Sequence, residues 1–160
     1  MISTIKSMSP KEMLYGLLTY LYGSKNIDLD FNKIEIKFNK NNRLKYVYYN
    51  GRPIFTFRNN DGYLLPLIEA ARYIRLPYVV VDEETAKHAI KGKSVPAKFI
   101  VRASPDLRPN AEVAVLDIKG NPVAVGRAIY SIRELSLGKG YAVKPRDTAE
   151  LDDPSTDATA

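Results

Sequence analysis

Residues 77–147 alternate short runs rich in valine and alanine with turns that contain glycine, and this pattern limits the folds open to the chain. Five strand-like runs follow one another within about 70 residues, and a single helix-like run, 83–91, comes after the first of them. Short strands in such close succession are typical of a closed or nearly closed sheet. We therefore predict a small mixed β-barrel over residues 77–147.

An amphipathic helix is predicted over residues 9–22. Ser9 is placed to cap this helix, Pro10 suits its first position, and Glu12 completes a capping box. A meander of strands is expected next, with the dipeptide Asn50-Gly51 as a hairpin turn. The predicted strands cover residues 33–38, 44–49 and 52–57, and a second predicted helix covers residues 63–74. Residues 1–76 should thus form an α-β-β-β-α domain, and the whole chain belongs to the α+β class.

Pro77 marks the expected junction between the two domains, 1–76 and 77–147. Residues 148–160 carry four acidic and no basic side chains and lack apolar periodicity, so we expect a disordered acidic tail. The sequence has no apolar run of about 18 residues, and its first residues are too polar for a secretory signal. It also has no cysteine. These features predict a cytoplasmic protein that does not enter a membrane.

The charge of the chain points to an anionic partner. The sequence contains 24 basic and 18 acidic side chains, which give a formal net charge of +6. Residues 1–78 carry 12 basic against 6 acidic side chains, and residues 79–147 carry 12 against 8, so the acidic tail masks part of a larger positive charge. Such a balance favours a nucleic acid as the partner. A lysine surface that serves only solubility is the alternative.

No set of residues in the sequence suggests catalysis, a metal site or a bound cofactor. His88 is the only histidine and has no second imidazole or serine arrangement to serve. Asp82, Glu83 and Glu84 are better explained as the cap and first turn of a helix than as a carboxylate site. Lys139 lies between two glycines, but the sequence that follows resembles a strand, whereas a phosphate loop leads into a helix. We therefore predict that the protein is not an enzyme.

The stretch GKSVPAKFIVRA, residues 92–103, combines apolar and basic side chains. Because side chains alternate between the faces of a strand, Lys98 and Arg102 should share one face with Ile100. The other face would carry Ala97, Phe99 and Val101. One face can then pack on a core while the other offers cations to a partner.

Three stretches in order resemble the PUA domain, an RNA-binding fold of pseudouridine synthases and archaeosine transglycosylases. They are VVVDEETAKHAIKGKSVPAKFIVRA, LRPNAEVAVLDIKGNPVAVGRAIYS and GKGYAVKPRD. In addition, NGRPIFTFRNNDGYLLPLIEAARYI is similar to part of the small domain that precedes PUA in archaeal tRNA-guanine transglycosylases. Together the two regions resemble the C-terminal, RNA-binding part of such an enzyme without its catalytic barrel, and the fold implied for residues 77–147 is a PUA-like pseudo-barrel.

The resemblance implies that a glycine loop and the strand after it form the RNA-binding surface. A glycine loop permits close approach of the backbone, and nearby cations neutralise phosphates. The RNA-binding residues expected on this basis are Lys91, Gly92, Lys93, Ser94, Lys98, Arg102, Arg127, Lys139, Lys144 and Arg146. The expected RNA is a tRNA, held at its acceptor stem or 3′ end. The protein would then be an accessory subunit that delivers tRNA to a separately encoded modifying enzyme.

Two other functions remain open at this stage. A ribosome-assembly factor can also join a small α/β domain to a PUA module, and its RNA would be pre-ribosomal. A protein-only adaptor would instead dock a partner on the tyrosine-rich surface of the first domain. That domain also offers a candidate second basic face, for which an ordinary solvated sheet face is the alternative; its residues are Lys33, Lys37, Lys45, Arg52 and Arg58.

Overall fold

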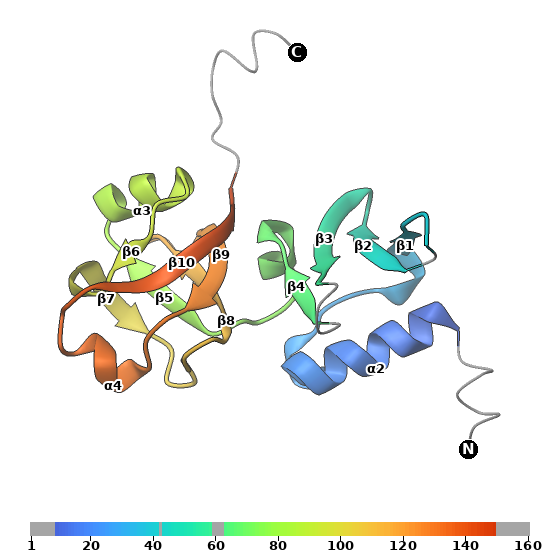
Figure 1. The fold of residues 1–160 in the computed structure, drawn as a ribbon, viewed down its shortest axis with the longest axis horizontal. Helices are drawn as coiled ribbons and strands as arrows, with labels where there is room; N and C mark the ends of the chain where they lie inside the picture. Colours follow the sequence, from blue (N-terminus) through green and yellow to red (C-terminus); the bar gives the residue numbers. More distant parts are fainter. Residues whose placement is uncertain (1–8, 42, 59–62, 150–160) are drawn as a thin grey trace, which may run out of the picture. The chain divides into compact units, whose positions relative to one another are not determined.

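The computed structural model describes residues 9–41, 43–58 and 63–149 of the 160-residue chain. The chain divides into two compact units, Met1–Leu76 and Pro77–Ala160, here called unit 1 and unit 2 (Figure 1). Within the described residues, every helix is too short or too polar to cross a bilayer. Each unit has its own sheet, and the two sheets are described separately below.

Unit 1 begins with helix α2 (Pro10–Tyr22), and its predicted capping box is confirmed. The Glu12 backbone N–H donates to Ser9 Oγ at 3.2 Å, and the Ser9 backbone N–H donates to Glu12 Oε2 at 3.1 Å. These bonds satisfy backbone groups that a helix end otherwise leaves without partners. Leu14 and Leu18, one helical turn apart, are buried. The helix therefore packs through one apolar side.

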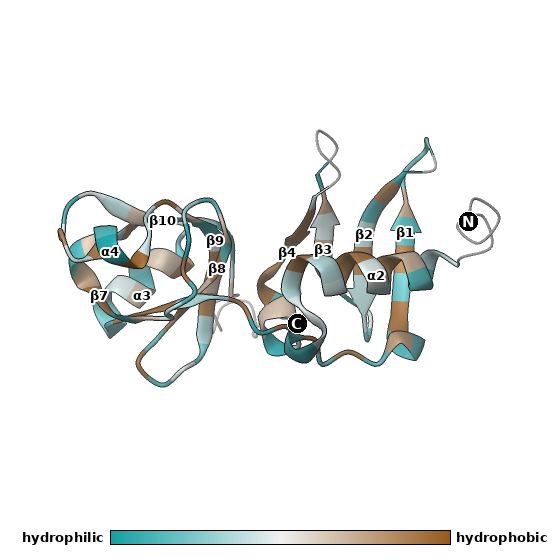
Figure 2. Cartoon of the chain, turned by 90° about the horizontal axis from the view of Figure 1, so that it is seen from below, coloured by the Kyte–Doolittle hydropathy of each residue, from teal (hydrophilic) through white to brown (hydrophobic). Residues whose placement is uncertain are grey.

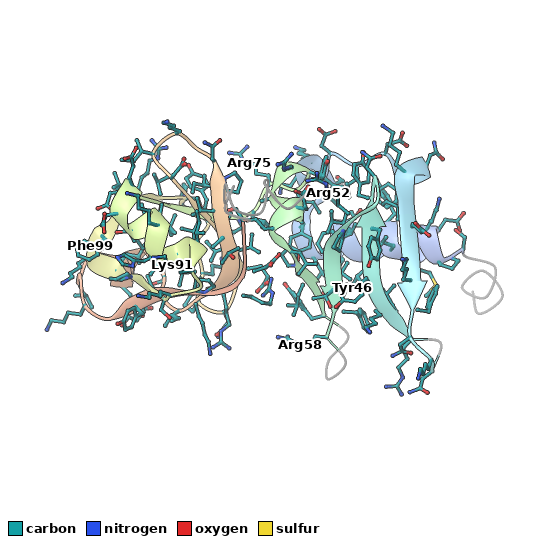
Figure 3. The ribbon with its side chains drawn as sticks, turned by 90° about the horizontal axis from the view of Figure 1, so that it is seen from above. Tyr46, Arg52, Arg58, Arg75, Lys91 and Phe99 are labelled. Atoms are coloured by element: carbon teal, nitrogen blue, oxygen red, sulfur yellow. The ribbon has the colours of Figure 1, made fainter. Side chains whose placement is uncertain are left out.

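Four antiparallel strands follow in the order β1-β2-β3-β4. They are β1 (Ile34–Phe38), β2 (Leu44–Tyr49), β3 (Arg52–Phe57) and β4 (Leu64–Pro66), with 3₁₀ turns at Ser24–Asn26 and Phe31–Lys33. The turn between β2 and β3 has positive φ at Asn50 (51°) and Gly51 (78°), as expected for this hairpin dipeptide. Helix α2 lies across one face of the sheet, in front of the strands in Figure 2 and behind them in Figure 3.

The predicted second helix over residues 63–74 is wrong. Residues Leu64–Pro66 form the edge strand β4, and Ile68–Arg72 form a 3₁₀ helix. Pro66 explains the difference, because a proline disfavours helical backbone at the residue before it and is tolerated on an edge strand. Pairing with β3 also buries Leu64 completely, opposite Phe57.

Unit 2 is a nearly closed mixed sheet of six strands in the order β6-β10-β9-β8-β5-β7. The pair β5·β8 is parallel and the other pairs are antiparallel. The strands are β5 (Tyr78–Val81), β6 (Val95–Pro96), β7 (Ile100–Ala103), β8 (Glu112–Leu116), β9 (Pro122–Ala128) and β10 (Tyr141–Thr148). Helices α3 (Glu83–Ile90) and α4 (Ile132–Leu135) complete the unit. The predicted α+β class and small mixed barrel are confirmed.

The core of unit 2 consists mainly of small branched side chains from the central strands, together with one side of α3. Val79, Val113 and Val115 are completely buried, and Ala89 places α3 against the same cluster. At Gly126 the backbone of β10 comes so close that an added Cβ would meet the Lys144 carbonyl oxygen. Small side chains thus let α3 and the strands approach one another closely.

Two further predictions in unit 2 need correction. Residues Ala97–Phe99 form a 3₁₀ turn rather than part of a strand, so Phe99 and Val101 are 44% and 64% exposed while Ile100 packs on the core. The proposed alternation over residues 97–102 is therefore wrong. The predicted tail also starts too early, because Thr148 pairs with Ala124 in the sheet. Residues 150–160 of that tail lie outside the described part of the chain.

Candidate nucleic-acid interface

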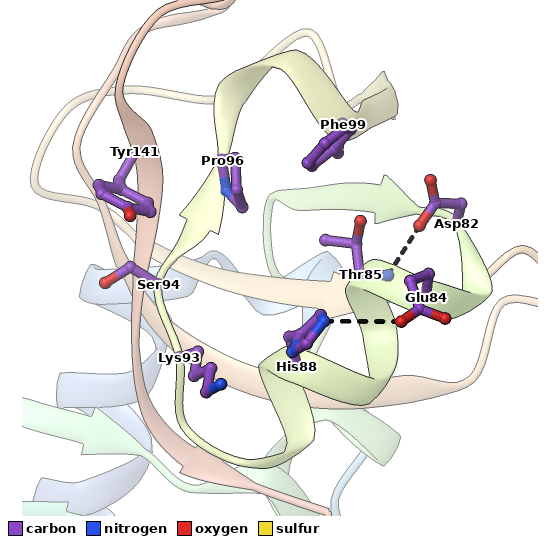
Figure 4. Close-up of a pocket in the computed structure, with 9 residues that line it drawn as sticks. All are labelled: Asp82, Glu84, Thr85, His88, Lys93, Ser94, Pro96, Phe99 and Tyr141. Carbon is purple, nitrogen blue, oxygen red and sulfur yellow. Dashed lines mark hydrogen bonds and ion pairs between the residues drawn. The ribbon is translucent and has the colours of Figure 1, made fainter.

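A pocket of about 780 Å³ opens in unit 2 beside the loop that joins α3 to β6 (Figure 4). Three parts of the unit line it. They are the acidic and polar side chains of α3 and its cap, the loop after α3, and two aromatic rings from separate elements. The lining residues are Asp82, Glu84, Thr85, His88, Lys93, Ser94, Pro96, Phe99 and Tyr141. This volume falls within the range of clefts that bind small molecules.

The loop after α3 has a fixed backbone conformation. Gly92 has a φ of +86°, and its N–H donates to the Ala89 carbonyl at 2.9 Å, while the Lys93 N–H donates to the His88 carbonyl at 3.2 Å. A Cβ added to Gly92 would have no neighbour within 4 Å. The loop is thus held by the end of the helix and still leaves open space for a ligand to approach its backbone.

The α3 side of the pocket carries carboxylates that already have structural partners. Asp82 caps the helix and accepts the Thr85 backbone N–H at 2.7 Å, and hydrogen bonds from Thr85 lower the pKa of its carboxyl. Glu84 Oε1 lies 3.7 Å from His88 Nε2, one helical turn away (Figure 4). Asp82 therefore holds the start of α3 in place, as predicted, and His88 faces the pocket beside Glu84.

Two exposed aromatic side chains from other elements complete the lining of the pocket (Figure 4). Tyr141, at the start of β10, is 57% exposed and pairs with Pro96 of β6, and Phe99 is 44% exposed. Lys98 Nζ lies 4.9 Å from the centre of the Phe99 ring. Exposed aromatic rings beside cations are the groups on which proteins stack unpaired bases.

Two of the ten predicted RNA-binding residues line this pocket, and four more are within two positions of a lining residue in the sequence. Lys93 and Ser94 line it directly. The Ala97 N–H donates to the Gly140 carbonyl at 2.9 Å, which brings the loop containing Lys139 next to the 3₁₀ turn that carries Lys98. We call these six residues the loop cluster: Lys91, Gly92, Lys93, Ser94, Lys98 and Lys139.

The other four predicted residues are on strands β7, β9 and β10 and do not line the pocket. Arg127 of β9 and Lys144 of β10 are exposed cross-strand neighbours. Arg102 is an exposed residue of β7 and is not among the residues that line the pocket. Arg146 forms an ion pair with Glu112, whose side chain is 6% exposed. Its guanidinium is thus engaged within the barrel, and we assign it a structural role.

Seven of the nine lining residues are absent from the predicted site, and three of them, His88, Phe99 and Tyr141, bring an imidazole or an aromatic ring to the pocket. The continuous strand predicted over residues 97–103 puts Phe99 on the core face, and no sequence motif gives His88 a role in a site. Tyr141 was read only as the start of a strand. The available signal was its position directly after the Gly-Lys-Gly turn, residues 138–140, and before the apolar part of the strand.

Comparison with known proteins gives a consistent result for both units. Residues 77–148 match the family model of the PUA domain, and residues 12–84 match that of the patch-forming domain C2 of tRNA-guanine transglycosylase. The tRNA-guanine(15) transglycosylase of Methanococcus vannielii is 32% identical over 144 residues, which cover 85% of this chain and 22% of that protein. The enzyme of the same name from Pyrococcus abyssi is 37% identical over 138 residues, covering 82% of this chain and 24% of that protein.

A solved structure shares the fold of both units. The structure of a conserved PUA domain protein from Thermoplasma acidophilum aligns with a TM-score of 0.70 at 20% identity, covering 94% of this chain and 96% of that chain. The transglycosylases are much longer, and the present chain spans less than a quarter of their length.

Proposed function

The chain carries a PUA domain and the patch-forming C2 domain of archaeal tRNA-guanine transglycosylases, and on this basis we propose that it binds tRNA. The binding site is the pocket of unit 2, with the loop cluster around it. The pocket takes an unpaired nucleotide of the tRNA 3′ end, and the cations of the loop cluster contact phosphates of the adjoining acceptor stem.

The observation that supports this proposal is the combination of two exposed aromatic rings with a cationic glycine loop at one pocket. Phe99 and Tyr141 offer ring surfaces for a base. Lys93 and Ser94 lie on the loop side, where an ammonium group and a hydroxyl group can bind a phosphate. Protein recognition of RNA favours unpaired ends and loops, because their bases are free to stack on aromatic side chains.

The adjoining stem also fits the surface of the barrel. An RNA helix presents phosphates and 2′-hydroxyl groups along a wide, shallow minor groove. Arg127 and Lys144, side by side on β9 and β10, supply exposed cations at a second place on the same unit. Val143, one residue before Lys144, pairs with Val95 next to the loop, so these cations can continue a contact that begins at the pocket.

We propose further that the protein is an accessory factor in tRNA modification. The matched region of the transglycosylases is limited to two domains, and the names of those relatives connect these domains with enzymes that act on tRNA. In this role the chain holds the tRNA while a separately encoded enzyme carries out the chemistry.

A salt titration tests the proposal. Affinity for a tRNA transcript is measured by filter binding between low and moderate salt, and it should fall steeply because each neutralised phosphate releases counterions. Replacing Lys93 by glutamine should reduce the slope of log affinity against log salt by about one. Lys119→Gln, in an exposed turn between β8 and β9, is the matched control. Binding that is absent, or that does not respond to salt, contradicts the proposal.

A further inference from the structure

The sheet of unit 1 has one face that α2 leaves open (Figures 2 and 3). Val47 and Tyr49 of β2 are buried, whereas Tyr46 and Tyr48 alternate with them and therefore lie on the open face. Strand register extends this face across the sheet, because Tyr46 is the Cα partner of both Lys37 on β1 and Thr56 on β3. The open face thus carries an aromatic centre with a cation at its side.

Both tyrosines of the open face, and Tyr63 at the adjoining hairpin, have a cation near the ring. Lys37 Nζ lies 4.4 Å from the centre of the Tyr48 ring, and Lys45 Nζ lies 5.7 Å from that of Tyr46. At the adjoining hairpin, the Arg58 guanidinium lies 5.4 Å from the Tyr63 ring. Figure 3 labels Tyr46 on β2 and Arg58 directly after β3, with the strands in front of α2.

The cations gather at one end of the sheet. Because neighbouring strands are antiparallel, the end of β1, the start of β2 and the end of β3 meet there. The exposed basic residues at this end are Lys37, Lys40, Arg43, Lys45 and Arg58. At the opposite end, Arg52 is paired with Glu69 at 3.2 Å, and Lys33 is an exposed cation in the turn before β1. Three of the five residues of the expected second basic face, Lys37, Lys45 and Arg58, therefore lie at one end of the sheet.

We propose that the open face of unit 1 is a second RNA-binding surface, which takes a single-stranded segment. Bases stack on Tyr46 and Tyr48, and phosphates lie along the end that carries Lys37, Lys45 and Arg58. Glu35 is the Cα partner of Tyr48 and repels phosphate from the other end of the face. This surface acts independently of the pocket in unit 2.

The ring geometry selects a single strand over a duplex. The Tyr46 and Tyr48 ring centres are 6.2 Å apart, and their planes are inclined by 63°. Successive bases of a duplex are parallel and about 3.4 Å apart, so they cannot cover both rings at once. A single strand can turn its bases separately, and the combination of aromatic rings with cations is what such strands bind.

The affinity test uses the full chain and a fluorescently labelled single-stranded RNA of eight nucleotides. In Tyr46→Leu/Tyr48→Leu the apolar surface stays but stacking is lost, and affinity should fall about tenfold or more for each ring. Tyr46→Phe/Tyr48→Phe keeps both rings and should bind as the wild type does. The matched control is Tyr20→Leu on α2, where the tyrosine is 86% exposed. If Tyr46→Leu/Tyr48→Leu binds the RNA as tightly as the wild type does, the proposal is overturned. The open face would then be assigned to a protein partner.

Photo-crosslinking separates this surface from the pocket, and it gives an answer even if the leucine variant does not fold. A single strand containing 5-bromouridine is crosslinked to the wild type and to the pocket variant Phe99→Leu/Tyr141→Leu. In both proteins the crosslink should appear on the tryptic peptide 46–58, which carries Tyr46 and Tyr48, because trypsin does not cleave between Arg52 and Pro53. Crosslinks confined to unit 2 overturn the proposal while tRNA binding by the pocket stands. A crosslink on peptide 46–58 without any effect of the pocket variant on tRNA affinity contradicts only the function proposed for unit 2.

Discussion

Replacing Arg146 by methionine tests whether this arginine supports the barrel or binds RNA. The sequence placed Arg146 among the RNA-binding residues, but its guanidinium is paired with Glu112 on β8. The Glu112 side chain is 6% exposed, so its charge depends on partners within the protein. Methionine removes the positive charge while keeping most of the apolar part of the side chain.

The expected loss of stability follows from burial. Breaking a fully buried ion pair by removing one partner costs about 3–5 kcal/mol, because the remaining charge stays buried. The Arg146 side chain is 27% exposed, so water can reach part of the site, and we reduce the expected loss to about 2–3 kcal/mol. For a domain of this size, that corresponds to a fall in Tm of roughly 10 °C or more.

Urea unfolding followed by circular dichroism measures the effect. Lys144→Gln is the matched control: Lys144 is an exposed cation two residues earlier on the same strand, and its loss should change the free energy of unfolding by less than about 0.5 kcal/mol. Adding Glu112→Gln to Arg146→Met should recover part of the loss, because the buried carboxylate is then absent. If Arg146→Met is as stable as the wild type and loses more tRNA affinity than Lys144→Gln, the structural assignment is wrong.

Three further predictions concern individual positions in unit 2. Gly126→Ala should destabilise the protein by about 3 kcal/mol or more in urea unfolding, because the added Cβ would meet the backbone of β10. An unchanged unfolding midpoint would show that β9 and β10 separate easily at this position. Gly92→Ala should weaken tRNA binding and cost only about 1–2 kcal/mol of stability, because its φ of +86° disfavours alanine while its surroundings are open. If the variant binds tRNA as well as the wild type does, the RNA does not approach the backbone of this loop closely. The folded-state pKa of Asp82 is lowered, so its carboxylate stabilises the fold above about pH 4 and this contribution is lost as the pH falls through the folded pKa. Unfolding of wild type and Asp82→Asn between pH 7 and pH 2.5 should show the extra acid sensitivity only in the wild type, and parallel curves would contradict this.

Local rules predicted several elements correctly because a few neighbouring residues determine them. The Ser9 capping box, the Asn50-Gly51 hairpin and the Asp82 cap depend on side chains within three positions of the backbone groups that they serve. The apolar run around Pro66 fitted either a helix or a strand by its pattern, and pairing with β3 decided the outcome.

The composition of the site depended on contacts that sequence spacing does not show. One 3₁₀ turn at Ala97–Phe99 shifts the alternation of the following strand, which moves Phe99 from an expected core position to the pocket. Arg146 is paired with a residue on β8, so its charge alone could not indicate its role. In unit 1, alternation separates Tyr46 from Val47, but only the position of α2 shows which of the two faces stays open.

Hydrogen–deuterium exchange of the full chain with and without tRNA tests the central claim most directly, because it shows where the RNA lies. We expect tRNA to slow exchange at the backbone amides of residues 91–99 and 138–141, which surround the pocket of unit 2. Saturating tRNA that leaves both of these segments unchanged, and slows exchange only elsewhere in the chain, would contradict the assignment of the pocket as the tRNA-binding site.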